Sequence, residues 1–254
     1  MSLVITTYVP EGIVMASDSR QSITIGGKTT DGKELSKVNT VNSDNVYKTY
    51  LLLRKDKNEK PIFEVGVQSF GQELLGGIST ASHIKRFSEE KLADEDDVTT
   101  IPKKLVQFFK ELFPAVDTGF HVAGYKKEDK VSVPYIYYCH IAKNIIKRKN
   151  IKPDGSIAYG ATWSGQVDVL SGILQPSLIP GPDGKPVTLH KPPIIWDAMT
   201  LQDAVDFSIY AIRTTIDTIR FQARPKNVGG PIDVLVITPD GAKWIQRKEL
   251  KGKT

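Results

Sequence analysis

The strongest indication of the fold is the stretch Gly12-Ile13-Val14-Met15-Ala16-Ser17-Asp18-Ser19-Arg20, together with the serine at position 2. Its apolar first half favours a β-strand, and a carboxylate and a guanidinium follow that half directly. A second β-rich run, Leu3–Tyr8, comes before it, and the turn-forming residues 9–12 separate the two runs. We therefore expect two strands joined by a turn, with Ser2 directly ahead of the first strand.

Ser2 becomes the first residue if the initiator methionine is removed, which generally happens when the second residue is as small as serine. Its hydroxyl and its free α-amine then belong to one residue, so a weak nucleophile carries its own base. An unperturbed α-amine titrates at about pH 8, so a useful fraction is free base at neutral pH. Ser2 is therefore a candidate nucleophile.

This N-terminal pattern resembles that of proteasome-type β-subunits, including bacterial proteasome-type proteins, which belong to the N-terminal-nucleophile hydrolases. The family keeps a fixed distance from its leading threonine to an aspartate after the second strand. The same spacing, from position 2 to position 18, separates Ser2 from Asp18. The resemblance implies that Ser2 takes the position of the nucleophile.

The rest of the chain predicts strands, two helices, more strands, a further helix and a final hairpin. The order contains no βαβ alternation, which indicates an α+β protein with helices on antiparallel sheets. The resemblance implies a four-layer αββα sandwich of two antiparallel sheets, formed by residues 1–254 as one domain. The expected strands after the first two are 36–41, 47–53, 62–67, 119–125, 132–146, 232–237 and 242–246.

Three helices and one irregular segment complete this prediction. One helix includes Leu74 to Phe87, a second is capped by Thr99 or Thr100, and a third is capped by Thr200. Residues 176–193 contain six of the fifteen prolines, so we expect no regular element there. A loop of this length is uncommon unless it binds or covers something.

The resemblance also implies a catalytic lysine at the start of the third strand and a glycine at the end of the fourth. Lys48 opens the strand that pairs with 62–67, and Gly66 precedes the first helix. Lys37 competes with Lys48, but choosing it would require an extra strand before the glycine, so we prefer Lys48. The N–H of Gly66 would serve an oxyanion hole, in which one donor contributes about 3 kcal/mol.

These residues would act together on Ser2. Lys48 would favour its alkoxide by Coulomb attraction, and Asp18 would keep Lys48 charged and oriented. Arg20 lies two residues beyond Asp18 on the same face of the strand, which fits a short charge network. Without the spacing to Ser2, Asp18 and Arg20 would instead indicate an ordinary ion pair at a strand end.

Two further elements of the family orient its N-terminal amine. A Ser-Gly element corresponds to residues 159–165, where Ser164 or Thr162 would supply a hydroxyl. An Asp-x-x-Ser-Gly-Gly element corresponds to residues 225–230, where Pro225 and Val228 replace the expected aspartate and serine. These departures weaken the case for full peptidase activity and leave the fold prediction unchanged.

Composition excludes several other classes of protein. The hydrophobic content of 40% and charged content of 25% are typical of a globular protein, and the net charge of +5 is spread along the chain. The single cysteine, Cys139, lies in an apolar run, which favours a buried thiol and a reducing compartment. No signal-like or membrane-spanning apolar stretch occurs, so we expect a cytoplasmic protein without membrane contact.

Motifs for cofactors, metals and nucleic acids are also missing from the sequence. The four histidines are scattered, and there is no CxxC, no complete phosphate loop and no G-x-S-x-G. The basic run 143–149 is too short to indicate a nucleic-acid groove. We therefore expect no cofactor, no metal and no nucleic-acid partner.

The leading hypothesis is an N-terminal serine/threonine-type peptidase that forms an acyl-enzyme through Ser2. The resemblance implies a homo-oligomeric ring or open ring that takes peptide substrates, with any ATPase partner unidentified. One alternative is an inert scaffold subunit of the same fold, which Pro225, Val228 and the segment 176–193 favour. A small-molecule amidase or acyltransferase on the same fold is another.

Overall fold

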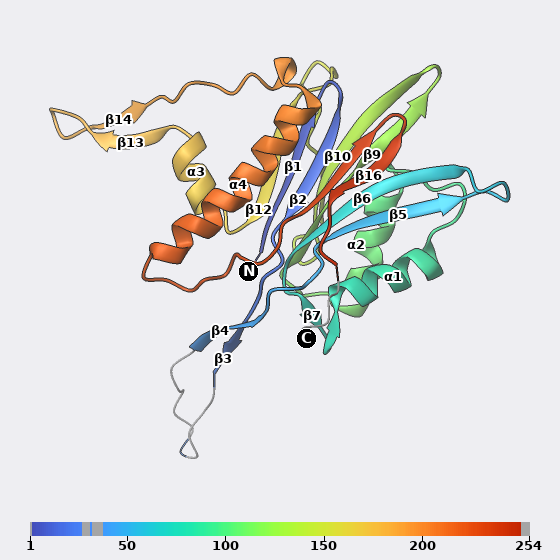
Figure 1. Ribbon diagram of the computed structural model, residues 1–254, viewed down its shortest axis with the longest axis horizontal. Helices are drawn as coiled ribbons and strands as arrows, with labels where there is room; N and C mark the ends of the chain where they lie inside the picture. The colour runs from blue at the N-terminus through green and yellow to red at the C-terminus, as the bar shows by residue number, and fades with distance from the viewer. Residues whose placement is uncertain (1, 27–30, 32–37, 250–254) are drawn as a thin grey trace.

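Two five-stranded antiparallel sheets form the centre of the molecule (Figure 1). The computed structural model describes residues 2–26, 31 and 38–249. The first sheet has the order β12-β1-β2-β15-β16. Its strands are β1 (Leu3–Val9), β2 (Gly12–Ser17), β12 (Gly160–Gly165), β15 (Asp233–Thr238) and β16 (Gly241–Gln246).

The second sheet has the order β11-β10-β9-β6-β5. Long hairpins build most of it, because β9 pairs with β10 and β5 pairs with β6 along nearly their full lengths. The expected strand 132–146 is divided into β10 and β11 by a turn at 141–144. The strands are β5 (Thr49–Lys55), β6 (Pro61–Gly71), β9 (Thr118–Glu128), β10 (Val131–His140) and β11 (Ile145–Arg148).

Residues of β2 show how the two sheets face each other. Ile13 and Met15 belong to a buried cluster that also contains Ala123 and Ile136 of the second sheet. The alternate residue Val14 instead joins the cluster beneath the helices that cover the first sheet. A strand that is apolar on both faces is expected where a sheet is covered on both sides. The apolar run that opens this sequence is therefore the middle of a sandwich.

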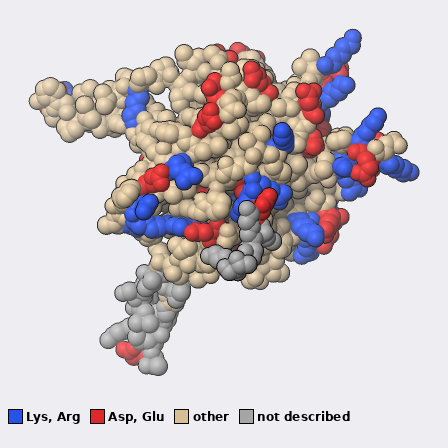
Figure 2. Space-filling model, in the orientation of Figure 1, with Lys and Arg blue, Asp and Glu red and all other residues tan. Residues whose placement is uncertain are grey.

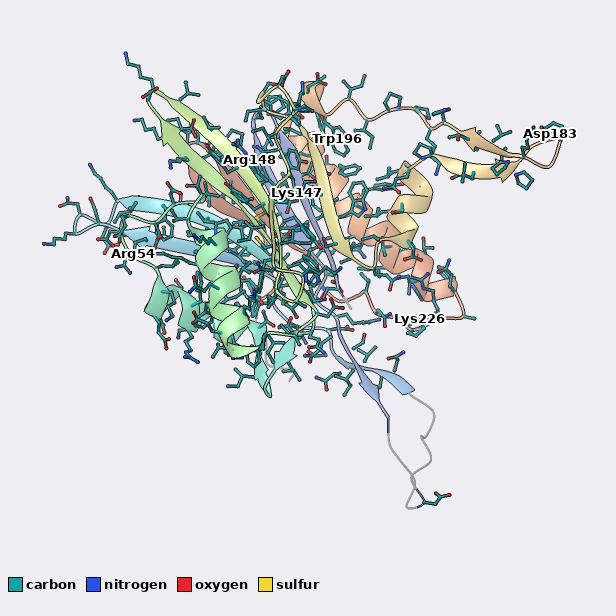
Figure 3. The ribbon with its side chains drawn as sticks, turned by 180° about the vertical axis from the view of Figure 1, so that it is seen from behind. Arg54, Lys147, Arg148, Asp183, Trp196 and Lys226 are labelled. Atoms are coloured by element: carbon teal, nitrogen blue, oxygen red, sulfur yellow. The ribbon has the colours of Figure 1, made fainter. Side chains whose placement is uncertain are left out.

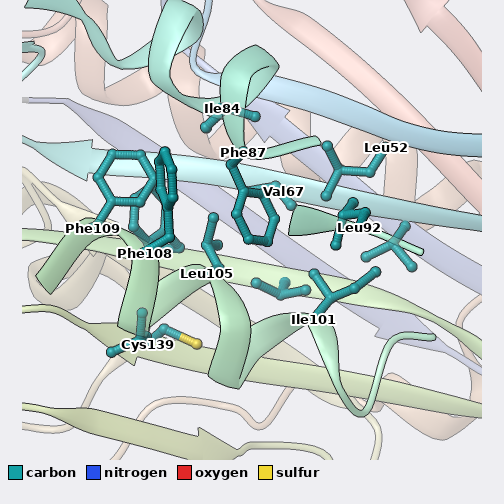
Figure 4. Close-up of a cluster of buried hydrophobic side chains, with 14 of the residues drawn as sticks. Leu52, Val67, Ile84, Phe87, Leu92, Ile101, Leu105, Phe108, Phe109 and Cys139 are labelled. Carbon is teal, nitrogen blue, oxygen red and sulfur yellow. The ribbon is translucent and has the colours of Figure 1, made fainter. Parts of the chain in front are cut away.

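Helices cover both outer faces, which gives the predicted α+β order of helix, sheet, sheet, helix. The helices α1 (Thr80–Lys91) and α2 (Ile101–Leu112) pack on the second sheet, and α3 (Asp168–Leu174) and α4 (Leu201–Phe221) pack on the first. Figure 4 shows the aromatic and aliphatic side chains of α1 and α2 against the strands of the second sheet. Cys139 lies in the same cluster, where burial raises the pKa of its thiol to about 12. This cysteine is a structural residue.

The helix caps agree with the sequence at two helices and differ at one. Thr200 caps α4 through a reciprocal capping box with Asp203, and Thr100 precedes α2 with Pro102 in its first turn. The first helix begins at Thr80, so the prediction that it includes Leu74 was wrong. Gly76 and Gly77, with φ values of 60° and 80°, instead form the turn of a short hairpin between β7 (Leu74–Leu75) and β8 (Ile78–Ser79).

Two hairpins project from the body of the molecule (Figure 1). One consists of β3 (Gln21–Ile25) and β4 (Val38–Ser43), so that the predicted strand 36–41 has a partner that the sequence did not indicate. The other consists of β13 (Ser177–Pro180) and β14 (Pro186–Leu189), with Asp183 at its tip (Figure 3). The expectation of no regular element in 176–193 was therefore wrong. Its prolines occupy the ends of a two-stranded ribbon, where few ladder hydrogen bonds are lost.

Charged side chains of both signs are interspersed on the face shown in Figure 2. The basic pair Lys147 and Arg148 lies on the outer strand β11, where the Arg148 guanidinium stacks on the Tyr135 ring at 3.7 Å (Figure 3). The 3₁₀ turn Trp196–Ala198 leads into α4, and Trp196 packs edge-on against Phe207. No helix within the described ranges is both long enough and apolar enough to cross a bilayer.

Candidate active site

Ser2 lies in the wall of a cleft of about 490 Å³ at the end of the sandwich where β2 and β6 terminate. Arg20 and Lys48 line the same cleft, as do Gly71 and Glu73 from the segment that ends β6. A second hollow of about 430 Å³ adjoins it and shares Ser2 and Gly71 with the first. The residue predicted as nucleophile therefore has a cavity on either side.

Lys48 and Asp18 form a fully buried ion pair beside Ser2. The Lys48 Nζ lies 2.7 Å from Asp18 Oδ1, and the two side chains are 1% and 0% exposed. The ammonium also donates to the carbonyl oxygen of Arg20 at 2.6 Å. The stability of the protein depends on both members of such a buried pair, because the loss of one leaves the charge of the other uncompensated. The competing residue Lys37 lies outside the described residues.

The Asp18 carboxylate also fixes the backbone next to Ser2. Asp18 follows the end of β2, and its Oδ1 accepts a hydrogen bond from the N–H of Leu3 at 2.9 Å. The N–H of Asp18 in turn donates to the Leu3 carbonyl at 3.2 Å. Asp18 thus joins the first residue of β1 to the Lys48 ammonium, and this contact explains why the spacing between the two strand ends matters.

The loop after β12 holds Ser2 from the other side. The N–H of Gln166 donates to the Ser2 carbonyl at 2.7 Å. Gly165 has a φ of 99°, and a Cβ at this position would lie 1.7 Å from the Ser2 oxygen. Only a glycine allows the two backbones to approach so closely. Ser2 itself is only 3% exposed, so contacts on both sides restrict its position.

Arg20 is paired with a residue that the sequence did not single out. Its guanidinium makes a bidentate contact with Asp44, at 2.6 Å and 2.8 Å, and donates to the Lys226 carbonyl at 3.2 Å. The Arg20 side chain lowers the pKa of the Asp44 carboxyl. Only the backbone N–H of Arg20 contacts Asp18, at 3.1 Å. The predicted network exists, but Arg20 contributes its main chain to Asp18 and its side chain to the neighbouring loops.

The structure places Gly66 away from the cleft and corrects its predicted position. Strand β6 continues to Gly71, so Gly66 lies in the middle of the strand rather than at its end. A Cβ on Gly66 would lie 2.3 Å from Met15 Sδ, which shows that this glycine faces the first sheet inside the sandwich. Gly71 instead ends the strand and lines the cleft beside Ser2. The predicted strand ended at Val67, four residues before the end of β6.

Ser164 lies in the second hollow with Ser2, and its hydroxyl contacts an imidazole. The distance from Ser164 Oγ to His121 Nε2 is 2.9 Å, and the other ring nitrogen lies 3.1 Å from Thr6 Oγ1. Burial lowers the pKa of His121 to about 3, so the ring is neutral at physiological pH. Ser164 is thus tied to a buried polar chain that continues from Thr6 to Gln68 between the sheets.

The segment 225–230, which departs from the family pattern, still reaches Asp18. The N–H of Gly229 donates to Asp18 Oδ2 at 3.1 Å, and its carbonyl accepts from the N–H of Ser19 at 3.0 Å. Val228 is 1% exposed and packs in the core under α4. Backbone groups of this loop therefore support the carboxylate, a contact that the side-chain pattern alone gave no means to predict.

Across the described parts of the chain, no three His, Cys, Asp or Glu side chains lie close enough together to hold a metal ion. The Asp18 carboxylate is held by the Lys48 ammonium and by several backbone N–H groups, and Lys48 lines the cleft together with Ser2. An ammonium fixed in the wall of the same cleft is suited to stabilising negative charge that develops on a hydroxyl there.

Comparisons with known proteins agree with this architecture. No family model matches the sequence, and no curated protein matches it either. Among solved structures, an Anbu mutant from Hyphomicrobium sp. strain MC1 aligns over 98% of this chain and 86% of its own, with a TM-score of 0.61 and 14% identity. Anbu from Yersinia bercovieri, described as an ancestral β-subunit, aligns over 96% and 86%, with a TM-score of 0.56 and 11% identity.

The fold is that of proteasome-like β-subunits. The expected α+β sandwich of two antiparallel sheets flanked by helices is therefore confirmed. At these identities the likeness concerns the fold alone, because one fold supports many different chemistries.

Proposed function

We propose that this protein is an N-terminal-nucleophile hydrolase that cleaves peptide bonds through Ser2 after removal of Met1. One observation supports this proposal above all others: Ser2 lines a cleft together with Lys48, and the Lys48 ammonium is held by a fully buried Asp18. A buried ion pair at the edge of a cleft is costly for stability alone, which favours a role in the site.

In the proposed reaction the Ser2 Oγ bonds to the substrate carbonyl carbon, and its proton passes to the α-amine of Ser2. The Lys48 ammonium lowers the free energy of the developing alkoxide. The α-amine then delivers the proton to the leaving nitrogen as the C–N bond breaks. Water, deprotonated by the same amine, attacks the ester and releases the acid, which restores the Ser2 hydroxyl.

We assign the oxyanion donor to the backbone N–H of Gly71 in place of Gly66. Gly71 lines the cleft beside Ser2 and has a φ of 102° at the end of β6. A Cβ there would lie 2.2 Å from the Asp117 carbonyl oxygen, so the position requires glycine.

A peptide is the substrate class that suits the shape of this site. The two hollows share Ser2, Gly71 and Asp117, so an extended chain can continue on both sides of the scissile bond. We further propose a single domain over residues 1–254 that assembles as a homo-oligomeric ring or open ring in the cytoplasm. The β13–β14 hairpin offers a surface for such contacts, because Leu178 and Leu189 are 72% and 51% exposed.

An inert scaffold subunit of the same fold is the second candidate. Val228 fills the position of an expected hydroxyl and is buried in the core, so no side chain of that loop replaces it. A small-molecule amidase would use the same Ser2 chemistry with only one of the two hollows.

Hydrolysis of a peptide library by the purified full-length protein separates these functions. We expect cleavage that Ser2→Ala abolishes and that Ser2→Thr retains, since threonine keeps the hydroxyl. Ser156→Ala, which removes an exposed hydroxyl that contacts Asp154 in the turn at 152–156, is the matched control and should retain the activity. Cleavage of small amides alone would favour the amidase. No cleavage of either class, with Met1 retained, would favour the scaffold.

A further inference from the structure

Glu73 is a carboxylate in the cleft wall that the proposed reaction does not use. It follows β6 by two residues and lines the same cleft as Ser2 and Lys48. Its Oε1 atom is buried, and within the described ranges it has no hydrogen-bond partner. Burial raises the pKa of Glu73 to about 8. A buried carboxyl oxygen without a hydrogen-bond partner is costly, and such an atom needs an explanation beyond packing.

The cations around Glu73 are already neutralised by other carboxylates. Lys48 pairs with Asp18 at 2.7 Å, and Lys248 pairs with Asp233. Each pair brings one positive and one negative charge, so neither leaves a cation for Glu73. Ionised Glu73 would therefore add to the cleft wall a negative charge that neither of these side-chain cations neutralises, and the N-terminal ammonium is a further cation that favours its ionised form.

The remaining charged groups of the cleft also have partners of their own. Arg20 is occupied by Asp44 at 2.6 Å. Asp117 stands at the boundary of the two hollows with its side chain 84% exposed and its Oδ1 3.1 Å from His140 Nε2. A ligand that enters the cleft thus meets two carboxylates, one of them without a counter-ion, and no cation that is not already paired among the described lining residues.

We propose that Glu73 binds a cationic group of the substrate, so that the site prefers amides with a lysine or arginine side chain next to the scissile bond. A guanidinium or ammonium would supply both the missing hydrogen-bond donor and the missing positive charge. The preference for such substrates rests on the proposed function, whereas binding of the cation at Glu73 does not need a reactive Ser2.

Cation binding at this position is coupled to proton release. Burial keeps Glu73 largely protonated in the free protein at neutral pH, while Lys48, Lys248 and the N-terminal ammonium favour its ionised form and Asp18 opposes it. The buried Tyr50, whose own pKa is raised well above 10 by burial and by Glu73, remains neutral. A bound cation favours the ionised carboxylate, so affinity should rise from pH 6 to about pH 8 and then level off.

Binding to the Ser2→Ala protein tests this directly, because that variant cannot turn over a ligand. N-acetyl-arginine amide and its uncharged analogue N-acetyl-citrulline amide are titrated by calorimetry. We expect the arginine compound to bind at least about tenfold more tightly, which is the range of a charged hydrogen bond. Adding Glu73→Gln should remove this difference. Glu89→Gln, an exposed acid on α1, makes the same change of net charge and should preserve it.

The result that overturns the proposal is equal binding of the two compounds to the Ser2→Ala protein, or an unchanged preference after Glu73→Gln. Absence of arginine binding at millimolar concentration would overturn it as well. Melting temperatures of both glutamine variants establish that the fold is intact.

Kinetics with the intact Ser2 separate this inference from the proposed function. In an active enzyme, Glu73→Gln should lower kcat/KM for an arginine substrate at least about tenfold and change that of a leucine substrate less than about twofold. Activity without such a preference would refute the role of Glu73 alone. Arginine binding without any acylation of Ser2 would refute the hydrolase alone.

Discussion

Asp18 accepts hydrogen bonds from four donors, of which Lys48 and Gly229 lie far from it in the sequence. Lys48 and the N–H of Leu3 bond to Oδ1, and the N–H groups of Arg20 and Gly229 bond to Oδ2. The residue therefore links the nucleophile's neighbour, the lysine and the last loop before β15.

Lys48→Met is expected to destabilise the protein by about 3 to 5 kcal/mol at pH 7, because it leaves the buried Asp18 charge uncompensated. The measurement is the free energy of unfolding in urea. Arg54→Met is the matched control, since the Arg54–Asp94 pair is exposed and should contribute only about 0 to 1 kcal/mol. Similar small losses for both variants would show that the buried pair does not stabilise the fold.

His121 predicts a specific loss of stability in acid. Its folded pKa of about 3 lies below the ordinary value of 6.5, so the unfolded chain takes up the proton first as pH falls. The stabilisation is complete above pH 6.5 and is lost as pH falls from there toward 3. Between pH 7 and 4.5, the wild type should lose about 2 to 3 kcal/mol more than His121→Asn. The free energy of unfolding in urea is measured for both proteins at the two pH values. If the wild type and His121→Asn lose the same amount, the ring is not buried in its neutral form.

At this scale the sequence supported Ser2, Asp18 and Lys48 as neighbours, because strand ends follow from spacing and from a family pattern. Gly229 and Glu73 had no such signal. Gly229 contributes a backbone N–H, which almost every residue type has. Glu73 is distinguished only by a buried carboxyl oxygen that has no hydrogen-bond partner among the described residues. Neither property can be recognised before the loops are placed in space.

At the scale of elements, the length of β6 determines which glycine meets Ser2. The strand pairs with β9 as far as Gly71 and Thr118, four residues beyond the predicted end at Val67. Apolar alternation could not reveal this extension, because Gln68 and Ser69 are polar and yet buried, Gln68 through a hydrogen bond to the Ala16 carbonyl of the other sheet. The N-cap at Thr200 was easier to predict, because its capping box with Asp203 is local, whereas Thr100 precedes α2 without a side-chain capping hydrogen bond.

Gly71→Ala should both destabilise the protein and reduce reactivity at Ser2. The new Cβ would meet the Asp117 carbonyl at 2.2 Å at a φ of 102°, so the end of β6 must move. Gly77→Ala is the control, because it has a positive φ of 80° but open space around it, and should cost only about 1 kcal/mol. If Gly71→Ala were no more harmful than Gly77→Ala in unfolding and in activity, the close approach at the cleft would be wrong.

At the scale of the whole molecule, the layered architecture followed from the order of strands and helices and from apolar runs long enough to be buried on both faces. Ile13 and Val14, adjacent in sequence, belong to the clusters on opposite faces of the first sheet. The projecting β13–β14 hairpin was not predicted, because six prolines in residues 176–193 indicated an irregular segment. Its exposed apolar side chains, Leu178 and Leu189 among them, form a surface that the proposed oligomer would cover.

The central claim is that the whole fold presents Ser2 as a free N-terminal nucleophile. The most direct measurement is the intact mass of the full-length protein before and after treatment with a β-lactone, followed by tandem mass spectrometry of the N-terminal peptide. We predict a chain that begins at Ser2 and gains one acyl group on that residue, with no adduct on Ser2→Ala. A chain that retains Met1 and stays unmodified, or an adduct located at another residue, would contradict it.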